Sequence, residues 1–499
     1  MLPAYWYLMM AVLSLMLPAG LLLVSIAGLD PTRAWDAAVG SLAASGLSGF
    51  LYWAVGFGLH FGGVGLVYTY PALQTLIWEW SALSTNWGSG WGMAGLNGWF
   101  LSGVDSTPLI YSLFLAHLPW VMTASMIPVI GLRGRAPAMA TLLIAACVGG
   151  VIYPIAGNWV QGGGWLSALG RNLQLGHGLL DYAGTGTVFL TAGGFAFAAL
   201  LLWVPRQSPQ PLEYEMLPAA HLPLLGVVGS LFVLMGSIGW LGANPLQVTL
   251  LDEMGLMRGA VNVMLAAGGG VLLPLLYTWF VTGQGDPLMG GRGFAAGAIA
   301  ILAASPFVQP GSAFLIGLIA GSLLPFVTYI CNSILQLDDV TGILHMVIIP
   351  AMVGLLFAGI LADGRAGIGW QMIGLDTYLG VPQQGVSGLF VADGYQADFP
   401  GQLQAQVIGL LALVLWGFLP GLLICTPISL LFYAVESLPS SHKRVIPTDE
   451  PQQSQEVPLH SEDLSIPQAL PSESTNYPQP KPRFTTLTRR RQPREPLNE

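Results

Sequence analysis

One carboxylate stands at the edge of a long apolar segment. Asp181 opens the stretch DYAGTGTVFL (181–190), which begins a Gly-rich span of membrane-helix length. A charge at the edge of hydrocarbon is costly unless it caps backbone amides or lines a wet cavity. The sequence therefore predicts a helix N-cap just outside the bilayer, a functional carboxylate, or both, because a capping side chain can also orient a substrate loop.

His345 is a lone histidine in an apolar segment. His345 follows Asp339 by six residues at the start of a second long apolar span. Imidazole titrates near neutral pH, so such a histidine suits proton transfer. A lone histidine on an apolar face is more often a packed, hydrogen-bonded core residue, and both interpretations stay open.

The sequence shows no motif for covalent chemistry. It contains no Walker loop, and its glycine triplets at 162–164 and 268–270 lack the strand context and the lysine of a phosphate site. No His, Cys, Asp or Glu cluster has metal-ligand spacing, and the three cysteines lie in apolar stretches. We predict no enzyme, no cofactor, no metal site and no nucleic-acid partner.

Composition assigns the protein to the membrane class. Hydrophobic residues make up 54% of the 499 residues and charged residues only 8%, against about 25% charged residues in a soluble domain. The 65 glycines predict helices whose backbones approach closely. We expect an all-α polytopic membrane protein, for which a pathway for a small solute is the natural function.

About eleven apolar segments are long enough to cross a bilayer core of about 30 Å, although the eighth is marginal. They lie near 5–28, 40–66, 107–131, 137–156, 179–203, 221–242, 257–282, 292–308, 312–334, 340–362 and 404–434.

Basic residues predict the orientation. With the N-terminus outside, the cytoplasmic loops hold Arg33, Arg133, Arg135, Arg206 and Arg292, and the outer loops hold Arg171, Arg258 and Arg365. The basic residues of the last sixty residues strengthen this bias. We expect a multi-pass protein of the cell (inner) membrane with its C-terminus in the cytoplasm.

The chain divides at residue 437. Residues 1–436 form the predicted membrane domain, and residues 437–499 are rich in Pro, Ser, Gln and Glu. This composition predicts a disordered cytoplasmic tail. Its basic end could contact anionic membrane lipids or a cytosolic regulator, or it could simply set the topology.

Aromatic side chains gather in the first long outer loop, 67–106. The loop carries Tyr68, Tyr70, Trp78, Trp80, Trp87, Trp91, Trp99 and Phe100, with Glu79 and Asp105 as its acidic residues. Interfacial anchoring is the simpler interpretation. A vestibule that gathers cations on ring faces is the alternative. Residues 363–403 form a second long loop without recognisable chemistry.

Several motifs occur in an order that resembles the ammonium transporter/Rhesus (Amt/Rh) family over residues 5–435. They are Trp53, Gly56 and Phe57 ahead of FGG within 49–62, YPIAGNWVQGGGWL at 153–166, DYAG at 181–184, GSIGWLGAN at 236–244, Asn262 with the following AAGGG, the run 285–321, and LDDVTGILHMVIIPAMVG at 337–354.

The resemblance implies a homotrimer of ammonium/ammonia channels. Each subunit would have helices 1–5 and 6–10 related as inverted repeats, plus a final helix. Asp181 and Asp339 open corresponding halves of such repeats, as expected when a site lies between them.

Residue roles implied by the resemblance transfer unevenly. Asp181 matches the family's structural and recruitment aspartate, and Trp240 falls on a gating phenylalanine. Asn244 replaces a recruiting serine, and its amide can still accept a hydrogen bond from ammonium. Gln161 replaces a tryptophan of the recruitment cage. In helix three, either Leu115 and Pro119 or, after a short shift, Phe114 or Trp120 take the gating positions.

The twin pore histidines of the family are the largest departure. Phe189 occupies the first position, and either His345 or Val347 occupies the second. Desolvation disfavours an ammonium ion in a dry pore, and a histidine pair would let ammonia and its proton separate. With Phe189 and His345 lining the pore, we expect slow electroneutral passage of ammonia, or no transport.

Three functions therefore stay open. The first is a transporter or channel for ammonia or a similar small neutral solute. The second is a non-conducting ammonium sensor that keeps the transporter fold. The third is an unrelated solute carrier on the same fold, because fold does not dictate function.

Overall fold

A computed structural model describes residues 2–84, 87, 90–102, 107–203, 222–337 and 339–437. Contacts divide the chain into two units, Met1–Leu438 and Pro439–Glu499. The predicted tail lies outside the described residues except for Ser437, as do Asp105 and Arg206.

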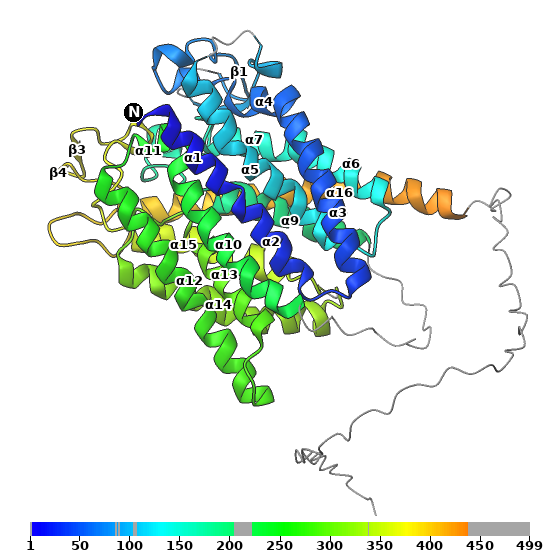
Figure 1. Ribbon diagram of the computed structural model, residues 1–499. Helices are drawn as coiled ribbons and strands as arrows, with labels where there is room; N and C mark the ends of the chain where they lie inside the picture. The colour runs from blue at the N-terminus through cyan, green and yellow to red at the C-terminus, as the bar shows by residue number, and fades with distance from the viewer. Residues whose placement is uncertain are drawn as a thin grey trace, which may run out of the picture. The chain divides into compact units, whose positions relative to one another are not determined.

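The first unit is built of helices that run side by side (Figure 1). The α-helices are α1 (Ala4–Ser14), α2 (Met16–Ile26), α3 (Pro31–Leu51), α4 (Phe57–Phe61), α5 (Pro108–Gly131), α6 (Ala138–Cys147), α7 (Tyr153–Val160), α8 (Leu169–Leu173), α9 (Thr191–Leu202), α10 (Leu222–Ala243), α11 (Pro245–Val248), α12 (Glu253–Thr282), α13 (Pro287–Ile301), α14 (Pro310–Tyr329), α15 (Ile349–Leu361) and α16 (Gly401–Ser437).

Short irregular helices join or extend these elements. The π-helical segments are η1 (Tyr52–Gly56), η6 (Val148–Ile152), η7 (Thr185–Leu190), η8 (Ile330–Ile334) and η9 (Leu344–Ile348). The 3-10 segments are η2 (Val64–Leu66), η3 (Pro71–Leu73), η5 (Trp99–Leu101) and η10 (Trp370–Met372). Two antiparallel pairs lie in the long loops: β1 (Glu79–Ser81) with β2 (Gly92–Gly95), and β3 (Thr377–Tyr378) with β4 (Val381–Pro382).

Ten spans among the described residues are long and apolar enough to cross a membrane. They are Ala4–Ile26, Pro31–Leu66, Pro108–Gly131, Ala138–Val160, Thr185–Leu202, Leu222–Ala243, Glu253–Thr282, Pro310–Ile334, Leu344–Leu361 and Gly401–Tyr433. Each corresponds to one of the predicted segments, so the polytopic all-α fold agrees with the sequence.

The remaining predicted segment, 292–308, differs from the structure. Helix α13 begins earlier and has 15 residues, because Pro287 occupies its first turn and Asp286 caps the Leu288 amide at 2.9 Å. It ends at Ile301, where the Ala303 amide instead donates to the Thr185 hydroxyl at 2.7 Å. Most of α13 is buried, so it is an inner helix of the bundle.

Glycines bring the first half of the chain against the second. Helices α2 and α10 contact each other along their lengths. A Cβ atom at Gly236 would lie 2.1 Å from the Leu17 amide nitrogen, and one at Gly20 would lie 2.5 Å from the Gly229 carbonyl oxygen. The helices can approach this closely only with glycine at these positions, as the glycine content predicts.

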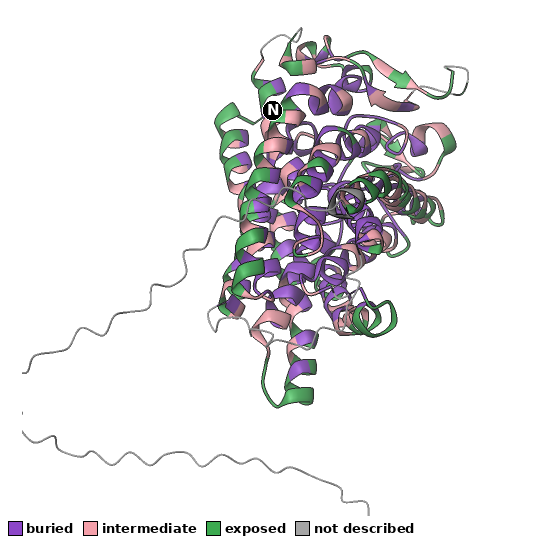
Figure 2. Cartoon of the chain, turned by 90° about the vertical axis from the view of Figure 1, so that its right-hand side faces the viewer, coloured by how far each residue is buried: buried purple, intermediate pink, exposed green. Residues whose placement is uncertain are grey.

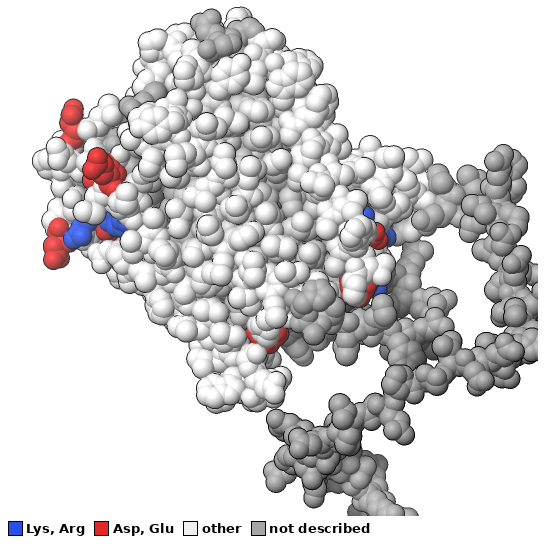
Figure 3. Space-filling view, in the orientation of Figure 1, with Lys and Arg blue, Asp and Glu red and all other residues white. Residues whose placement is uncertain are grey.

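The outer surface suits a bilayer. Figure 2 shows buried residues gathered inside the bundle and exposed residues on the outer helices. Many of these exposed residues are large and apolar, including Phe280, Leu423 and Phe326. On the face shown in Figure 3, charged side chains gather near the edges and leave a broad uncharged area between them. An apolar surface with charges at its margins is what a membrane-spanning bundle needs.

Candidate functional site

Asp181 caps the π-helical segment η7. Its carboxylate accepts hydrogen bonds from the Gly186 amide at 3.1 Å, the Thr187 amide at 2.8 Å and the Thr187 hydroxyl at 2.7 Å. The side chain is buried, so these donors offset the cost of removing a charge from water. The capping role that the sequence allows is therefore present.

Two glutamines hold the backbone around Asp181. The Gln161 side-chain amide donates to the Asp181 carbonyl oxygen at 3.3 Å and to the Thr187 hydroxyl at 3.2 Å. The Gln406 amide on α16 brackets Leu180, accepting from its N–H at 3.0 Å and donating to its C=O at 2.9 Å. Gln161 thus ties the Asp181 backbone to the Thr187 side chain.

Three stacked rings lie directly beyond this cap. Trp240 on α10 stacks on Trp120 of α5, with ring centroids 4.8 Å apart and planes 22° apart. Phe189 of η7 also stacks on Trp240, with ring centroids 5.7 Å apart and planes 26° apart. Gly184 makes room for the stack, since its φ is +76° and a Cβ there would lie 2.6 Å from Trp120. Of the residues considered for the helix-three gate, Trp120 meets Trp240.

Asn244 faces a histidine that the sequence reasoning missed. Its Oδ1 caps α11 by accepting from the Leu246 amide at 3.0 Å, and its Nδ2 lies 3.5 Å from Nε2 of His117. Nδ1 of His117 lies 2.9 Å from the Leu113 carbonyl oxygen. A carbonyl oxygen can only accept, so Nδ1 carries the proton of the neutral ring and Nε2 presents a lone pair beside Asn244.

His60 is a second histidine that the sequence analysis did not single out, and it contacts His117. The centroids of His60 on α4 and His117 are 4.9 Å apart, with the ring planes at 78°. Nδ1 of His60 lies 3.0 Å from the Tyr52 hydroxyl. Both imidazoles are fully buried. The sequence held one signal for these histidines. His117 and Trp120 are three residues apart, which places both on one face of the helix that carries the candidates for the helix-three gate.

The rings form one continuous file. Tyr153 contacts His60 at 5.6 Å, and His117 contacts Trp120 at 4.9 Å. Three polar atoms in this file lack a hydrogen-bond partner: Nε2 of His60, Nε1 of Trp120 and the Tyr153 hydroxyl. Buried polar atoms are rarely left unpaired unless a water or another guest meets them.

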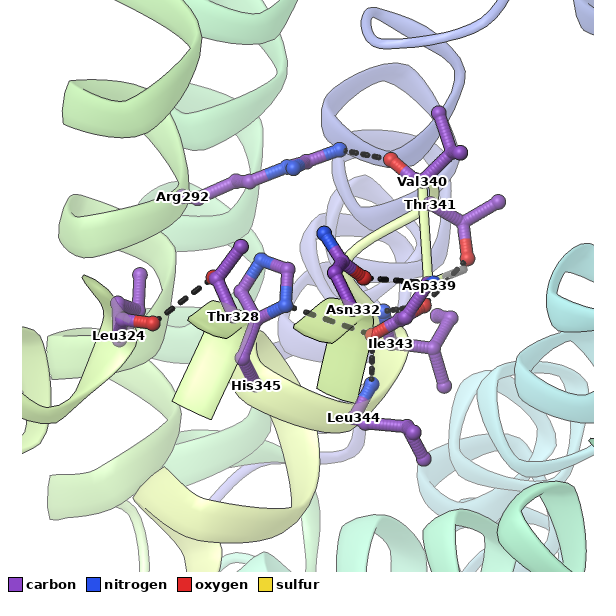
Figure 4. A network of polar contacts seen from close by, with 10 residues as sticks. All are labelled: Arg292, Leu324, Thr328, Asn332, Asp339, Val340, Thr341, Ile343, Leu344 and His345. Carbon is purple, nitrogen blue, oxygen red and sulfur yellow. Dashed lines mark hydrogen bonds and ion pairs between the residues drawn. The ribbon is translucent and has the colours of Figure 1, made fainter. Parts of the chain in front are cut away.

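His345 lies in a different cluster, with Asp339 and Arg292 (Figure 4). Nδ1 of His345 is 3.4 Å from the Asp339 carboxylate. Arg292 donates to the Val340 carbonyl oxygen. A Cβ added at Gly342 would lie 2.9 Å from Nε of Arg292 and 3.0 Å from Nε2 of His345. The guanidinium and the imidazole therefore both lie against Gly342, close to each other.

Asp339 repeats the capping pattern of Asp181. Its carboxylate accepts from the Ile343 amide at 3.1 Å, the Leu344 amide at 2.7 Å and the Thr341 hydroxyl at 3.1 Å, at the start of η9. Segments η7 and η9 contact each other. This correspondence is what an inverted repeat predicts.

Among the described ring contacts, none joins His345 to Phe189 or Trp240. Val347 is buried as well, so both candidates for the second histidine position lie inside the bundle. The structure thus brings Trp240, Phe189 and Asn244 together with His117 and Trp120, close to Asp181, and places His345 with the second aspartate.

The first long loop holds a half-buried glutamate, Glu79, as well as exposed aromatic rings. Trp78, Trp80 and Trp87 are exposed, which fits both interfacial anchoring and a vestibule. Burial raises the pKa of Glu79 to about 7, although Arg171 opposes the shift.

An open pocket of about 630 Å³ lies beside α11. Trp6, Asp252 and Glu253 are among the residues that line it.

No group of three or more His, Cys, Asp or Glu side chains among the described residues could hold a metal ion. The three cysteines are free.

Known proteins with similar sequences are ammonium transporters. Ammonium transporter Amt2 of Archaeoglobus fulgidus is 35% identical over 286 residues, which cover 56% of this chain and 60% of the relative. Ammonium transporter Amt1 of Methanocaldococcus jannaschii is 30% identical over 263 residues, which cover 51% of this chain and 63% of the relative. The chain thus spans about three fifths of the length of these relatives.

Solved structures show the same fold. The protein described as Sensor Amt Protein superposes with a TM-score of 0.66 at 21% identity, covering 85% of this chain and 92% of that chain. Mep2 of Saccharomyces cerevisiae superposes with a TM-score of 0.62 at 19% identity, covering 87% of this chain and 85% of that chain. These likenesses confirm an all-α polytopic membrane fold.

The sequence model of the Ammonium Transporter Family matches residues 4–438. The match runs through all of the membrane spans and through the residues of the ring stack and both aspartate caps. It confirms the resemblance that the ordered motifs indicate, and the chain belongs to the ammonium transporter family.

Proposed function

We propose that this protein takes up ammonium on one side of the membrane and passes it through each subunit as ammonia. The observation that carries the proposal is the juxtaposition of hydrogen-bond acceptors with a closed aromatic stack. Nε2 of His117 presents a lone pair beside Trp120, which stacks on Trp240. Oδ1 of Asn244, which accepts from the Leu246 amide, keeps a second lone pair nearby. Ring faces attract cations, and the acceptors fit the N–H groups of ammonium.

The neutral form is favoured beyond this point. Trp120, Trp240 and Phe189 are buried, and along the stack they offer ring faces and the unpaired Nε1–H donor of Trp120 but no hydrogen-bond acceptor. An ammonium ion that enters the stack loses its hydrogen bonds to water. The Asp181 oxygens do not replace them, because they already accept from two amides and a hydroxyl.

Uptake of labelled methylammonium by cells without ammonium carriers of their own tests the proposal. We expect saturable uptake that ammonium inhibits and that Asn244→Leu lowers several-fold. His177→Gln is the matched control, because His177 is also buried but contacts Tyr378 in the long loops. In vesicles, uptake of a neutral species does not follow an imposed membrane potential; uptake that does follow it would contradict neutral passage.

A relay test accompanies this measurement. Uptake equal to that of a transporter with both pore histidines, and lost in His345→Ala, would show that His345 serves a working relay despite Phe189. We expect instead slower uptake, because Phe189 cannot accept a proton.

A non-conducting sensor is the second candidate function. The three-ring stack favours it, because buried rings with centroids 4.8 and 5.7 Å apart leave little room for a solute between their faces. Ammonium binding to the purified protein, without uptake in cells or vesicles, would establish the sensor and exclude the transporter.

The assembly and setting belong to the same proposal. We propose a homotrimer in the cell (inner) membrane, surrounded by lipids, with the N-terminus outside and the C-terminus in the cytoplasm, where a regulator could bind the tail. The ten membrane spans and the family membership support a multi-pass membrane protein. The loop arginines support the orientation.

A further inference from the structure

We infer that His117 and His60 form a proton-accepting pair that deprotonates ammonium beside the Trp120–Trp240 rings. The inference rests on the proposed function and names the residues that perform its deprotonation step. Neither histidine occupies the positions discussed for His345 and Phe189.

Nε2 of His117 has a lone pair that can accept a proton. Its Nδ1 is committed to the Leu113 carbonyl oxygen, which leaves the Nε2 lone pair facing Asn244 at 3.5 Å. This distance is long for a hydrogen bond. An ammonium ion between the Trp120 ring and Asn244 would be a stronger donor to Nε2 than the side-chain amide is.

His60 can receive the proton next. Its Nε2 is buried and has no partner, and its centroid is 4.9 Å from that of His117. Its Nδ1 is 3.0 Å from the Tyr52 hydroxyl. The site is shaped for this ring, because a Cβ at Gly157 would lie 2.4 Å from both Cε1 and Nε2 of His60. An unpaired, fully buried nitrogen beside a second imidazole indicates a site for a mobile proton or a small polar guest.

The step balances in protons and charge. One N–H bond of ammonium breaks, its electron pair stays on ammonia, and an Nε2–H bond forms on His117. The proton then moves to Nε2 of His60, directly or through one water, while Nδ1–H of His60 donates to the Tyr52 hydroxyl. The pair holds one proton at a time, since two adjacent imidazolium ions repel each other.

The proton passes from His60 back to water on the side from which ammonium arrives, the side of the first long loop. Residues 58–62 pack beneath that loop: a Cβ at Gly58 would lie 2.9 Å from Trp99, and one at Gly62 would lie 2.6 Å from the Leu96 amide. Ammonia alone continues past Trp240. No net charge crosses the membrane, so this pair serves the neutral passage that the proposed function requires.

Nitrogen NMR of the full chain with ¹⁵N-labelled imidazoles tests the pair. Ammonium chloride is compared with sodium chloride at equal concentration. We expect ammonium to convert ring nitrogens of two histidines toward the protonated form. His117→Asn removes both changes, because it blocks the first transfer, and His60→Gln removes one. His177→Gln loses only its own signals.

Uptake measurements give the second readout. We expect His117→Asn and His60→Gln to lower methylammonium uptake at least about tenfold, in line with the loss of an acid–base group. Gly157→Ala keeps both imidazoles but displaces His60, and it should lower uptake as well. If a histidine variant fails to fold, the wild-type spectra and Gly157→Ala still decide the question.

The outcomes separate the two claims. Wild-type uptake with unchanged imidazole signals, or full uptake in His117→Asn, would overturn the pair and leave the proposed function standing. A wild-type chain that shows neither uptake nor ammonium-dependent signals would refute both.

Discussion

The polar atoms that matter most to a passing solute are those that the protein leaves unpaired. Nε2 of His60, Nε1 of Trp120 and the Tyr153 hydroxyl are buried without partners, although the residues around them are closely packed. Each such atom costs about 1–3 kcal/mol of stability. Unpaired buried atoms occur elsewhere in the described residues too, but these three lie along one file of rings, where a polar guest would find hydrogen-bond partners in turn.

At the same scale, Glu79 makes the stability of the first long loop depend on pH. Burial raises its pKa from 4.5 to about 7, with Arg171 opposing. The folded protein therefore holds this proton more tightly than the unfolded chain does. The contribution to the free energy of unfolding is fully present below about pH 4.5 and is lost as the pH rises to about 7.

Glu79→Gln should remove this dependence. We expect the stability of the variant, relative to the wild type, to rise between about pH 4.5 and pH 7 and then level off. Thermal unfolding in detergent across this range measures it. Glu253→Gln, at an exposed position, is the control. Parallel curves for wild type and Glu79→Gln would contradict the prediction.

The sequence predicts Asp181, Trp240 and Asn244 as site residues and does not point to the two histidines that lie beside them. Asp181, Trp240 and Asn244 are recognisable because they stand in ordered motifs of one segment each. His60 and His117 meet only through the packing of α4 against α5, and no spacing within either helix reveals that contact. Which side chains of two helices meet depends on how each helix is rotated about its axis. A helix that is apolar on every face carries no sequence pattern that specifies this rotation.

Among the elements, the π-helical segments border the site. Segment η1 carries Tyr52, η6 ends before Tyr153, η7 carries Phe189 and η9 carries His345. Such segments are rare in proteins and occur frequently at functional sites. Hydropathy does not predict them, because a single residue inserted into a helix hardly changes the pattern of a span that is apolar almost throughout. Helix positions were predictable, since they depend mainly on the length of each apolar run.

The two capped π-helical segments should respond alike to loss of charge. Asp181→Asn and Asp339→Asn each put an NH₂ group where a carboxylate oxygen accepts an amide proton. We expect each to cost about 2–3 kcal/mol of stability, the effect of leaving a buried donor unpaired. Thermal unfolding in detergent gives the value.

Exposed Asp376→Asn serves as the control for these variants. A large loss for one buried aspartate and none for the other would argue against equivalent repeats. The inverted-repeat interpretation requires both losses.

At the scale of the whole molecule, the unit Met1–Leu438 carries all of the described site. We expect removal of residues 439–499 to leave thermal stability and methylammonium uptake unchanged, because the contacts that hold α16 to α9 and α15 lie within this unit. Uptake and unfolding of the shortened chain test this. A chain shortened before Gly421, which packs against Phe195, should lose stability. A change in uptake without a change in stability would instead favour a regulatory tail.

The stack of Trp120 and Trp240 has an optical consequence. Two indoles with centroids 4.8 Å apart and planes 22° apart share their electronic excitation. Such a pair gives a coupled signal in near-ultraviolet circular dichroism, and the signal decays steeply when the rings separate. The difference between the spectra of the wild type and Trp120→Phe therefore reports the separation of these two rings among the 16 tryptophans, and it is readable while ammonium is added and before any flux is measured.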